Sequence, residues 1–427
     1  MEPTHYDFII LGSGFVESTL ASILANENKK VIVLDRNDVY GADLATLQYS
    51  QLEDYFGTNV KHPDLMTLNK DFCIDITPKL LLADSDVVKL LIKYKIDDTL
   101  EFVNIPGSFI YKNKLHHVPC SEAQSLKTGL VGFWEKYHVM KFFWDVKAYG
   151  GNPNSYVFKK TMREEFAKYG LSKDVIEFIG HGIALNLDDS YLDKHPKETF
   201  DKICQYVKSL MSFESTLKSP YIYPKYGISG IIQGFIRNAC IHKAEVMLRA
   251  DIIDINTESN TIKVIEPVDK KELCITADKI IADQSYIQMH NASYEVIRGI
   301  CILKGESEIT KKASSSQILF LKSEYKRKND IFVVILGKDE EATPDGYKVA
   351  IISTVKETSD PEKEILPVVS KLGNIVRSFV EVRNVYKTDD YKNILFTKGV
   401  DESTHFESLF SELCDICKKL DIKLDLN

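Results

Sequence analysis

The stretch Tyr6–Leu20, which reads YDFIILGSGFVESTL, decides the fold of this chain. Its first part, residues 6–11, is an unbroken apolar run, which predicts a strand covered on both faces of a parallel sheet. Residues 15–26 follow with a helical pattern, and a second apolar run occupies residues 31–34. Together these segments predict a βαβ unit within the first 35 residues.

Two glycines and an aspartate give this unit the features of a dinucleotide site. Gly12 and Gly14 occupy the turn between strand and helix, and Asp35 follows the second strand, where an acidic residue holds ribose hydroxyls. Glu17 stands where the third glycine of G-x-G-x-x-G would be. Its carboxylate would compete with a pyrophosphate for the positive end of the helix, or it caps the helix and points away. We therefore expect the fold without a cofactor, with these four residues as its vestiges.

The composition is that of an ordinary soluble globular protein. The 427 residues suffice for two domains or one elaborated domain, and 44% of them are hydrophobic. A net charge of −8 argues against nucleic-acid binding. The chain has no apolar segment of about 20 residues that would cross a bilayer. With no signal peptide at Met1, the eight cysteines are expected as reduced thiols in the cytoplasm. We expect no metal site at the C-x-x-C pair Cys414 and Cys417, because a second pair is lacking.

The remaining chain divides into strand-rich and helical parts. We expect a helix over 78–94 with Asp84 or Ser85 as N-cap, a hairpin at 109–118, and a helical insert over 121–216. Within the insert, Leu126, Leu130, Phe133, Tyr137 and Met140 recur at helical spacing. Strands are predicted at 245–254, 262–266, 273–276, 279–281, 299–304, 316–322, 331–336 and 347–354, and a closing helix at 404–420 with a capping box from Thr404.

A series of segments resembles the Rab GDP-dissociation inhibitor and Rab escort protein superfamily. They are residues 7–43, which include Glu17, PGSFIYKNKLHHVPCSEAQSL (106–126), DVIEFIGHGIAL (174–185), KSPYIYPKYGISGIIQGFIR (218–237), ADQSYIQ (282–288), VIRGICILK (296–304) and ESTHFE (402–407). The series covers nearly the whole chain, in the family's order. The chain length resembles that of the inhibitors, since escort proteins are usually longer.

The resemblance implies a fold like that of FAD-dependent oxidases, of the α/β class with mixed sheets. A discontinuous domain, residues 1–118 and 222–427, would carry a Rab-binding platform, and a helical domain, 119–221, a pocket for a prenyl lipid. It also implies no cofactor, no metal and no catalysis. The partner would be a GDP-bound, geranylgeranylated Rab GTPase, which a cytoplasmic, monomeric protein lifts from membranes during transient contact.

The platform residues carried over from the family are Tyr40, Arg237 and Met247. Without the resemblance, the sequence favours a turn residue, a solvated helix face and a core residue; with the resemblance, binding is favoured. The chain departs from the family at Gly230, where a glutamate is usual, and at Glu245, where the family has a threonine-like residue. Loss of a carboxylate at Gly230 could weaken pairing with a cationic residue of the GTPase.

The resemblance also assigns three further groups. The mobile loop at 218–227 contains Lys218, Ser219, Pro220, Tyr221, Tyr223 and Tyr226, whose tyrosines suit an exposed contact surface. The region around Val87, Leu90 and Leu91 would hold the C-terminal tail of the GTPase. The candidates for the prenyl-lipid pocket, each of which could also be helix-bundle core, are Leu130, Phe133, Phe143, Val146, Phe166, Ile179, Ile183 and Cys204.

Three other functions stay open at this point. An active flavin enzyme would carry a bound chromophore. A Rab escort protein would stimulate prenylation by the transferase. A scaffold that has lost Rab binding would fit the change at Gly230.

Overall fold

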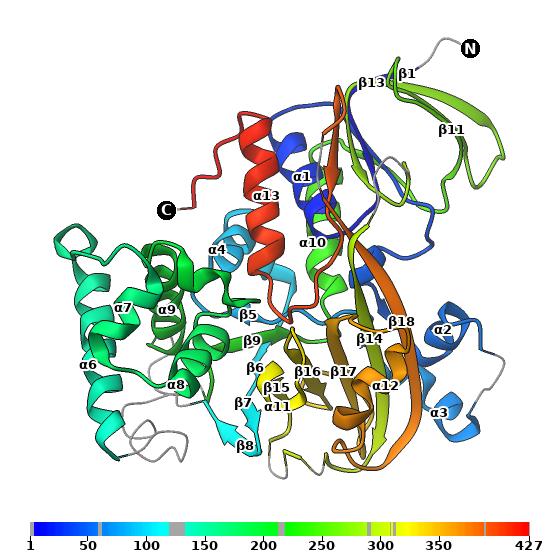
Figure 1. The fold of residues 1–427 in the computed structure, drawn as a ribbon. Coiled ribbons are helices and arrows are strands. Elements are labelled where there is room, and N and C mark those ends of the chain that lie inside the picture. Colours follow the sequence, from blue (N-terminus) through cyan, green and yellow to red (C-terminus); the bar gives the residue numbers. More distant parts are fainter. Residues whose placement is uncertain are drawn as a thin grey trace.

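The computed structural model describes residues 4–58, 62–118, 133–211, 218–287, 292–307, 309–310, 313–387 and 390–426, with the side chains of Phe133 and Trp134 left out. Its first sheet is built on the βαβ unit (Figure 1). The strand order is β10-β2-β1-β13-β12-β11, and β19 also pairs with β13. The strands are β1 (Thr4–Leu11), β2 (Val31–Leu34), β10 (Glu245–Met247), β11 (Asp251–Asn256), β12 (Thr261–Ile265), β13 (Glu272–Asp283) and β19 (Ile394–Thr397).

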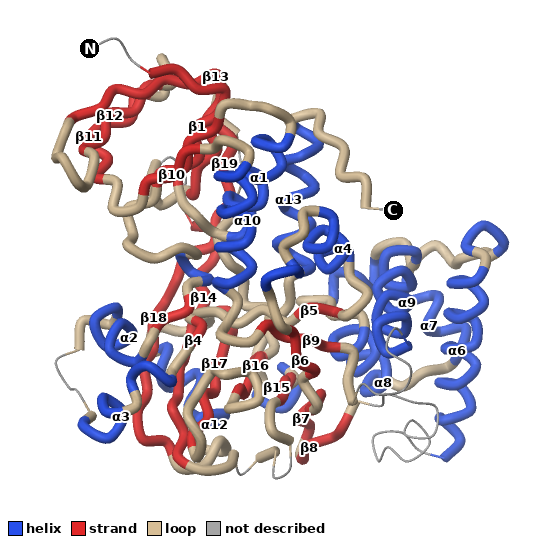
Figure 2. The backbone as a smooth tube through the Cα atoms, turned by 180° about the vertical axis from the view of Figure 1, so that it is seen from behind, coloured by secondary structure: helices blue, strands red, loops and turns tan. Residues whose placement is uncertain are grey.

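Three helices cover one face of this sheet, side by side in both views (Figures 1 and 2): α1 (Phe15–Asn26), α10 (Ser229–Ile241) and α13 (Glu407–Lys419). Phe15 at the start of α1 joins them, because its ring lies 6.1 Å from that of Phe235 and 4.9 Å from that of Phe406. The apolar run of β1 is buried because β2 and β13 flank it in parallel and helices cover it. The predicted βαβ unit is confirmed.

A second sheet of seven strands, in the order β18-β14-β17-β16-β15-β7-β8, lies below the first in Figure 1. All its neighbours are antiparallel except β15 and β7. Its strands are β7 (Gly107–Lys112), β8 (Lys114–His117), β14 (Ala292–Lys304), β15 (Ser316–Phe320), β16 (Ile331–Leu336), β17 (Tyr347–Val355) and β18 (Ile375–Tyr386), with α11 (Lys322–Tyr325) and α12 (Pro361–Val369) beside them.

Short elements connect the two sheets. β5 (Leu81–Leu82), β9 (Tyr221–Pro224) and β6 (Phe102–Asn104) form one small sheet, and β3 (Thr46–Leu47) and β4 (Ile74–Asp75) form another. The connecting helices are α2 (Tyr49–Tyr55), α3 (Pro63–Thr67) and α4 (Asp86–Lys93).

Residues 133–211 consist of helices joined by loops and contain no strand. They form α6 (Phe133–Gly151), α7 (Met162–Tyr169), α8 (Lys173–Glu177), which continues as a π-helix (Phe178–Ile183), and α9 (Lys197–Met211). Phe142 packs against both Phe166 and Phe200 at the centre. One hydrophobic cluster runs from these rings through α4 to α1, so the helical part shares its core with the sheets. No helix in the described part of the chain is long and apolar enough to cross a membrane.

Several expected boundaries were wrong. The helix predicted over 78–94 begins only at Asp86, because Leu81 and Leu82 pair with β9; Ser85 is the N-cap and accepts a bond from the Val88 amide. The predicted strand 245–254 is two strands, since Arg249 has a φ of 54°. Residues 273–276 and 279–281 belong to one strand. The capping box at Thr404 is absent, because α13 begins at Glu407 without a side-chain cap.

Candidate functional site

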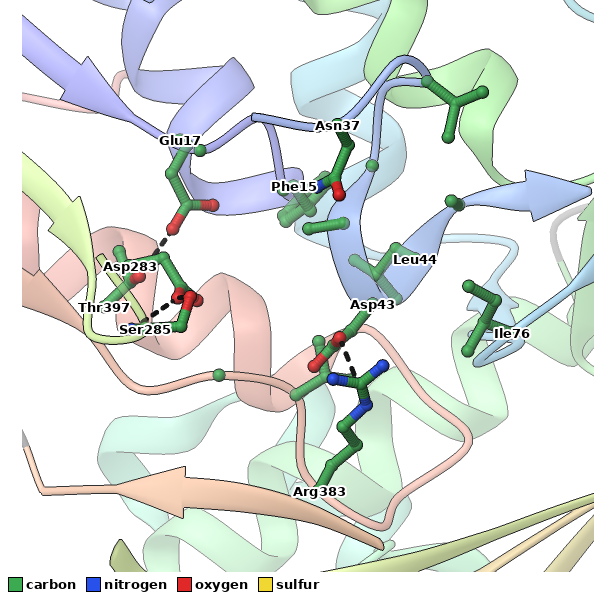
Figure 3. A pocket seen from close by; sticks show the side chains of 18 of the residues that line it. Phe15, Glu17, Asn37, Asp43, Leu44, Ile76, Asp283, Ser285, Arg383 and Thr397 are labelled. Carbon is green, nitrogen blue, oxygen red and sulfur yellow. Dashed lines mark hydrogen bonds and ion pairs between the residues drawn. The ribbon is translucent and has the colours of Figure 1, made fainter. Parts of the chain in front are cut away.

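A cleft of about 630 Å³ opens where β1 and β2 end, between them and β18 (Figure 3). This is the edge at which a βαβ unit binds a dinucleotide. Gly12 and Gly14 line the cleft, and Gly12 has a φ of 106°, a conformation that favours glycine. The residues that line this cleft therefore decide whether the chain could hold a flavin or nicotinamide dinucleotide.

Glu17 occupies the start of α1. Its side chain folds back so far that a Cβ on Gly14 would lie 2.6 Å from its Oε2, while its Oε1 accepts a 2.5 Å hydrogen bond from the Thr397 hydroxyl. Burial, followed by the nearby Asp283 carboxylate, raises the pKa of Glu17 from 4.5 to about 8. The carboxyl group therefore takes the place at the helix N-terminus where a pyrophosphate would bind.

Asp35 is also unavailable for a cofactor. Its carboxylate is buried and accepts bonds from the Ser13 hydroxyl (2.5 Å), the Asn37 amide (2.8 Å) and side chain (2.9 Å), and the Tyr286 hydroxyl (3.1 Å). These donors occupy the oxygens that would hold ribose hydroxyls.

The wall around Glu17 is acidic as well. Asp283 and Glu412 both line the cleft, and burial raises the pKa of each, that of Glu412 to about 7. Arg383 reaches into the cleft from β18, where its Nε lies 3.8 Å from the Asp43 carboxylate (Figure 3). Because a pyrophosphate would meet the Glu17 carboxyl at the helix end, the residues present do not fit a dinucleotide.

The predicted platform residues lie on three connected elements. Tyr40 is half-buried in the loop after β2, and burial, followed by the neighbouring Cys240 of α10, raises the pKa of its phenol. Arg237 is exposed on α10, one turn before Cys240. Met247 is half-buried at the end of β10 and its carbonyl accepts the Asp35 amide at 2.9 Å. The loop, the helix and the strand thus meet at the carboxyl end of β2.

The two departures from the family, Gly230 and Glu245, lie in different surroundings. A Cβ at Gly230 would lie 3.1 Å from the Cδ2 atom of Leu100, so the Leu100 side chain would have to shift by a few tenths of an ångström to admit one. Glu245 is exposed at the start of β10. Burial of Tyr6 is the largest cause of the raised pKa of its phenol, and the neighbouring Glu245 carboxylate raises that pKa further. Glu245 pairs with Ile32 of β2, and its side chain reaches Tyr6 of β1; Glu245 and Met247 are the two ends of β10.

The expectation of an exposed tyrosine surface at 218–227 is wrong for most of that segment. Tyr221 and Tyr223 are fully buried in β9, and the Tyr223 hydroxyl donates to Asp75. Ser219 and Pro220 are buried as well, whereas Lys218 and Tyr226 are exposed. Pairing of β9 with both β5 and β6 puts this segment inside the protein.

The region proposed to hold the C-terminal tail of the GTPase is buried rather than exposed. Val87, Leu90 and Leu91 are all buried on the inner face of α4. Ile92 is the exposed apolar residue of that helix, at 56%, and the Lys93 ammonium donates to the Asp425 carbonyl at 2.8 Å. A tail that follows α4 would contact Ile92 rather than the three predicted residues.

The lipid-pocket candidates do not surround one cavity. Leu130 and the side chain of Phe133 lie outside the described part of the chain. Val146, Phe166 and Ile179 are packed core, and Phe143 and Cys204 are half-buried against it. Ile183 lines a cavity of about 310 Å³ between the helices and residues 403–411.

That cavity contains polar groups that the sequence did not single out. Both ring nitrogens of His405 and both carboxylate oxygens of Glu407 are buried and lack a hydrogen-bond partner among the described residues. Burial lowers the pKa of His405 to about 3 and raises that of Glu407 to about 7. The sequence marks the ESTHFE segment only as a family likeness and a helix-capping pattern, because its position beneath the helices depends on long-range packing.

The comparisons with known proteins agree along the full length. The profile of the family described as GDP dissociation inhibitor matches residues 1–427. The probable secretory pathway GDP dissociation inhibitor 1 of Schizosaccharomyces pombe is 36% identical, covering 97% of this chain and 96% of its own. Rab GDP dissociation inhibitor beta of Rattus norvegicus is 33% identical, covering 97% and 94%.

Solved structures give the same result. The crystal structure of Rab GDI from Plasmodium falciparum has a TM-score of 0.90 and 31% identity, covering 99% of this chain and all of that one. A putrescine oxidase with a TM-score of 0.54 and 10% identity, covering 98% and 99%, shares the fold alone. The expected likeness to oxidases is confirmed at the level of fold. The chain belongs to the GDP dissociation inhibitor family.

Proposed function

We propose that this protein binds Rab GTPases in their GDP-bound, prenylated form, slows release of GDP, and keeps them soluble after removal from membranes. Membership of the family makes it a regulator of GTPases and not an enzyme. The Rab partner is suggested by the printed names of its relatives.

One observation supports this proposal above the others. Tyr40, Arg237 and Met247 are all at least partly exposed, and they come from the three elements that meet at the end of β2. α10 is held from behind by α1, so Arg237 projects from a packed support. A cation and a phenol on such a support suit the polar surface of a folded partner.

Preference for the GDP state follows from the partner. The γ-phosphate and its Mg²⁺ order the switch loops of a GTPase, and hydrolysis releases them. A rigid surface that fits only the released loops favours the GDP state, whereas equal affinity for both states would select neither.

The lipid adds solubility more than affinity. A prenyl chain gains about 0.8 kcal/mol per buried CH₂ relative to water. The chain starts in a bilayer, however, and lipid tails are as apolar as a protein pocket. Transfer between them is nearly neutral, so extraction depends on contacts with the folded GTPase. We place the lipid among the helices of residues 133–211, where Phe143 and Cys204 border the packed core.

The first test is Arg237→Glu. Charge reversal should weaken binding to a GDP-loaded Rab at least tenfold in isothermal titration, because an interface cation is replaced by a repelling carboxylate. Lys263→Glu, at an exposed position of β12, makes the same change of charge away from the platform. It should leave the affinity for GDP-loaded Rab within twofold of the wild type. Unchanged affinity of the Arg237→Glu protein would refute the platform.

An escort activity is the remaining alternative. A prenylation assay with the transferase separates the two, since an escort stimulates the reaction and an inhibitor does not. Incubation with liposomes that carry GDP-loaded or GTP-loaded prenylated Rab, followed by flotation, tests extraction. Release of both forms alike, or of neither, would contradict the proposal.

A further inference from the structure

The outer face of α6 exposes a stripe of large apolar side chains. Tyr137, Met140 and Trp144 are 60%, 37% and 56% exposed. Their spacing of three and four residues puts them on one face of the helix. α6 is the outermost helix of the helical part in both views (Figures 1 and 2). We call these three residues the α6 stripe.

The stripe is separate from the hydrophobic core. The opposite face of α6 carries Phe142, Val146 and Tyr149, which are buried. Phe142 packs against Phe166, with ring centroids 5.4 Å apart, and against Phe200, 5.5 Å apart. α6 is therefore apolar on two faces, and only one of them has a partner in this chain.

Charge around the stripe is arranged by sign. Both acidic residues of α6 are hydrogen-bonded within the chain, since Glu135 accepts from the Ser172 amide at 2.9 Å and Asp145 accepts from the Tyr169 hydroxyl at 2.5 Å. Lys141 and Lys147 are exposed on the two flanks of the stripe. Neither has an ion-pair partner in the part of the chain that the structure describes. Two lysines free of ion pairs among the described residues thus flank the stripe, on a protein whose net charge is −8.

A second protein copy is a poor occupant for this surface. At about 150 to 250 Å² for each large side chain, roughly half exposed, the stripe offers roughly 300 Å². A stable protein interface needs about 800 Å² from each partner.

A bilayer surface matches the same features. Tryptophan and tyrosine rings favour the level of the lipid headgroups, and flanking lysines favour anionic headgroups. We propose that the α6 stripe, with Lys141 and Lys147, is a binding surface for anionic lipid bilayers. This inference rests on the proposed function, in which the protein removes a GTPase from membranes. It assigns the contact with the membrane to α6. Vesicle binding itself does not depend on a GTPase.

Vesicle binding by the purified full chain tests the inference. With vesicles of phosphatidylcholine containing about 30% phosphatidylserine, the protein should co-float at low salt and dissociate as salt screens the lysines. The chain has two tryptophans, both in α6, so their emission should shift to the blue on binding. Trp144→Phe should remove most of that shift.

Two double variants separate the apolar and charged contributions. Met140→Gln/Trp144→Gln and Lys141→Glu/Lys147→Glu should each lower the partition coefficient at least fivefold. For the apolar change the control is Val268→Gln, which is 82% exposed in the β12–β13 turn; for the charge change it is Lys263→Glu/Lys271→Glu. Near-ultraviolet circular dichroism should show native packing in all four proteins.

The inference is overturned if the wild-type protein ignores these vesicles, or if the α6 variants bind as well as their controls. Sedimentation that shows a dimer dissolved by Met140→Gln/Trp144→Gln would also overturn it, because the occupant would then be a second copy. The proposed function has its own readout. Affinity for unprenylated GDP-loaded Rab in solution should be unchanged in the α6 variants, and Arg237→Glu should leave vesicle binding by the protein alone unchanged.

Discussion

Glu17→Gln should make the protein more stable in alkali and less sensitive to pH. The carboxyl group of Glu17 is buried and accepts a 2.5 Å hydrogen bond from the Thr397 hydroxyl. Glutamine keeps its shape and an oxygen acceptor for Thr397. It removes the ionisation that burial disfavours.

The magnitude follows from the difference between the folded and unfolded chains. Burial raises the pKa of Glu17 from its ordinary 4.5 to about 8. Below pH 4.5 the group is protonated in both states and costs nothing. As pH rises from 4.5 to 8, only the unfolded chain loses the proton, so stability falls, by up to about 5 kcal/mol at 1.36 kcal/mol per pH unit. Between pH 5.5 and 8.5 the loss should be about 3 kcal/mol.

The assay is urea unfolding at these two pH values, followed by tryptophan emission and circular dichroism. The wild-type protein should lose about 3 kcal/mol more than Glu17→Gln between pH 5.5 and 8.5. Glu362→Gln, on the exposed face of α12, is the matched control and should follow the wild type. Parallel pH profiles for the wild type and Glu17→Gln, or a variant that is weaker at pH 8.5, would refute the reasoning.

Two further predictions concern the core and the lipid. Lys79→Met should cost about 3 to 5 kcal/mol of unfolding free energy in urea, because the buried Lys79 ammonium lies 2.6 Å from the Asp401 carboxylate, which would lose its partner; an unchanged unfolding midpoint would contradict this. Phe143→Ser should speed loss of prenylated Rab from the soluble complex at least fivefold, while affinity for unprenylated Rab stays within twofold, because Phe143 borders the helical core and lies off the platform. Equal effects on both forms, measured by gel filtration and titration, would sink the lipid assignment.

The parts of the fold that depend on local sequence could be predicted. The run before Gly12, the helix after it and the strand that ends at Asp35 were recognised because burial on both faces leaves an unbroken apolar pattern. The hairpin of β7 and β8 was equally visible, with Asn113 at a φ of 58° in its turn.

What failed depends on partners distant in the sequence. Leu81 and Leu82 look helical beside α4, and only their pairing with β9 makes them a strand. Tyr221 and Tyr223 read as amphipathic surface residues, yet the strands on both sides bury them. The long β18 was missed because its inward and outward residues alternate little.

The candidate site was partly predictable for the same reason. Glu17 identified a changed cofactor turn from its position alone. The four donors on Asp35 could not be foreseen, since Tyr286 reaches it from 251 residues away. Nor could the sequence reveal the close approach of Gly230 to Leu100, because Leu100 lies far earlier in the chain, just before β6.

The support beneath Arg237 has a consequence for how partners are distinguished. Phe235 of α10 interlocks with Phe15 and, through it, with Phe406 near the carboxyl terminus. Two segments remote in the chain thus support that helix, and a shift of α10 would disturb both of these aromatic contacts. On the proposed function, Arg237 stands on a packed support, so structural adjustment on binding would fall mainly to the GTPase. GTPases whose switch loops are already released would then bind with the smallest loss of binding free energy.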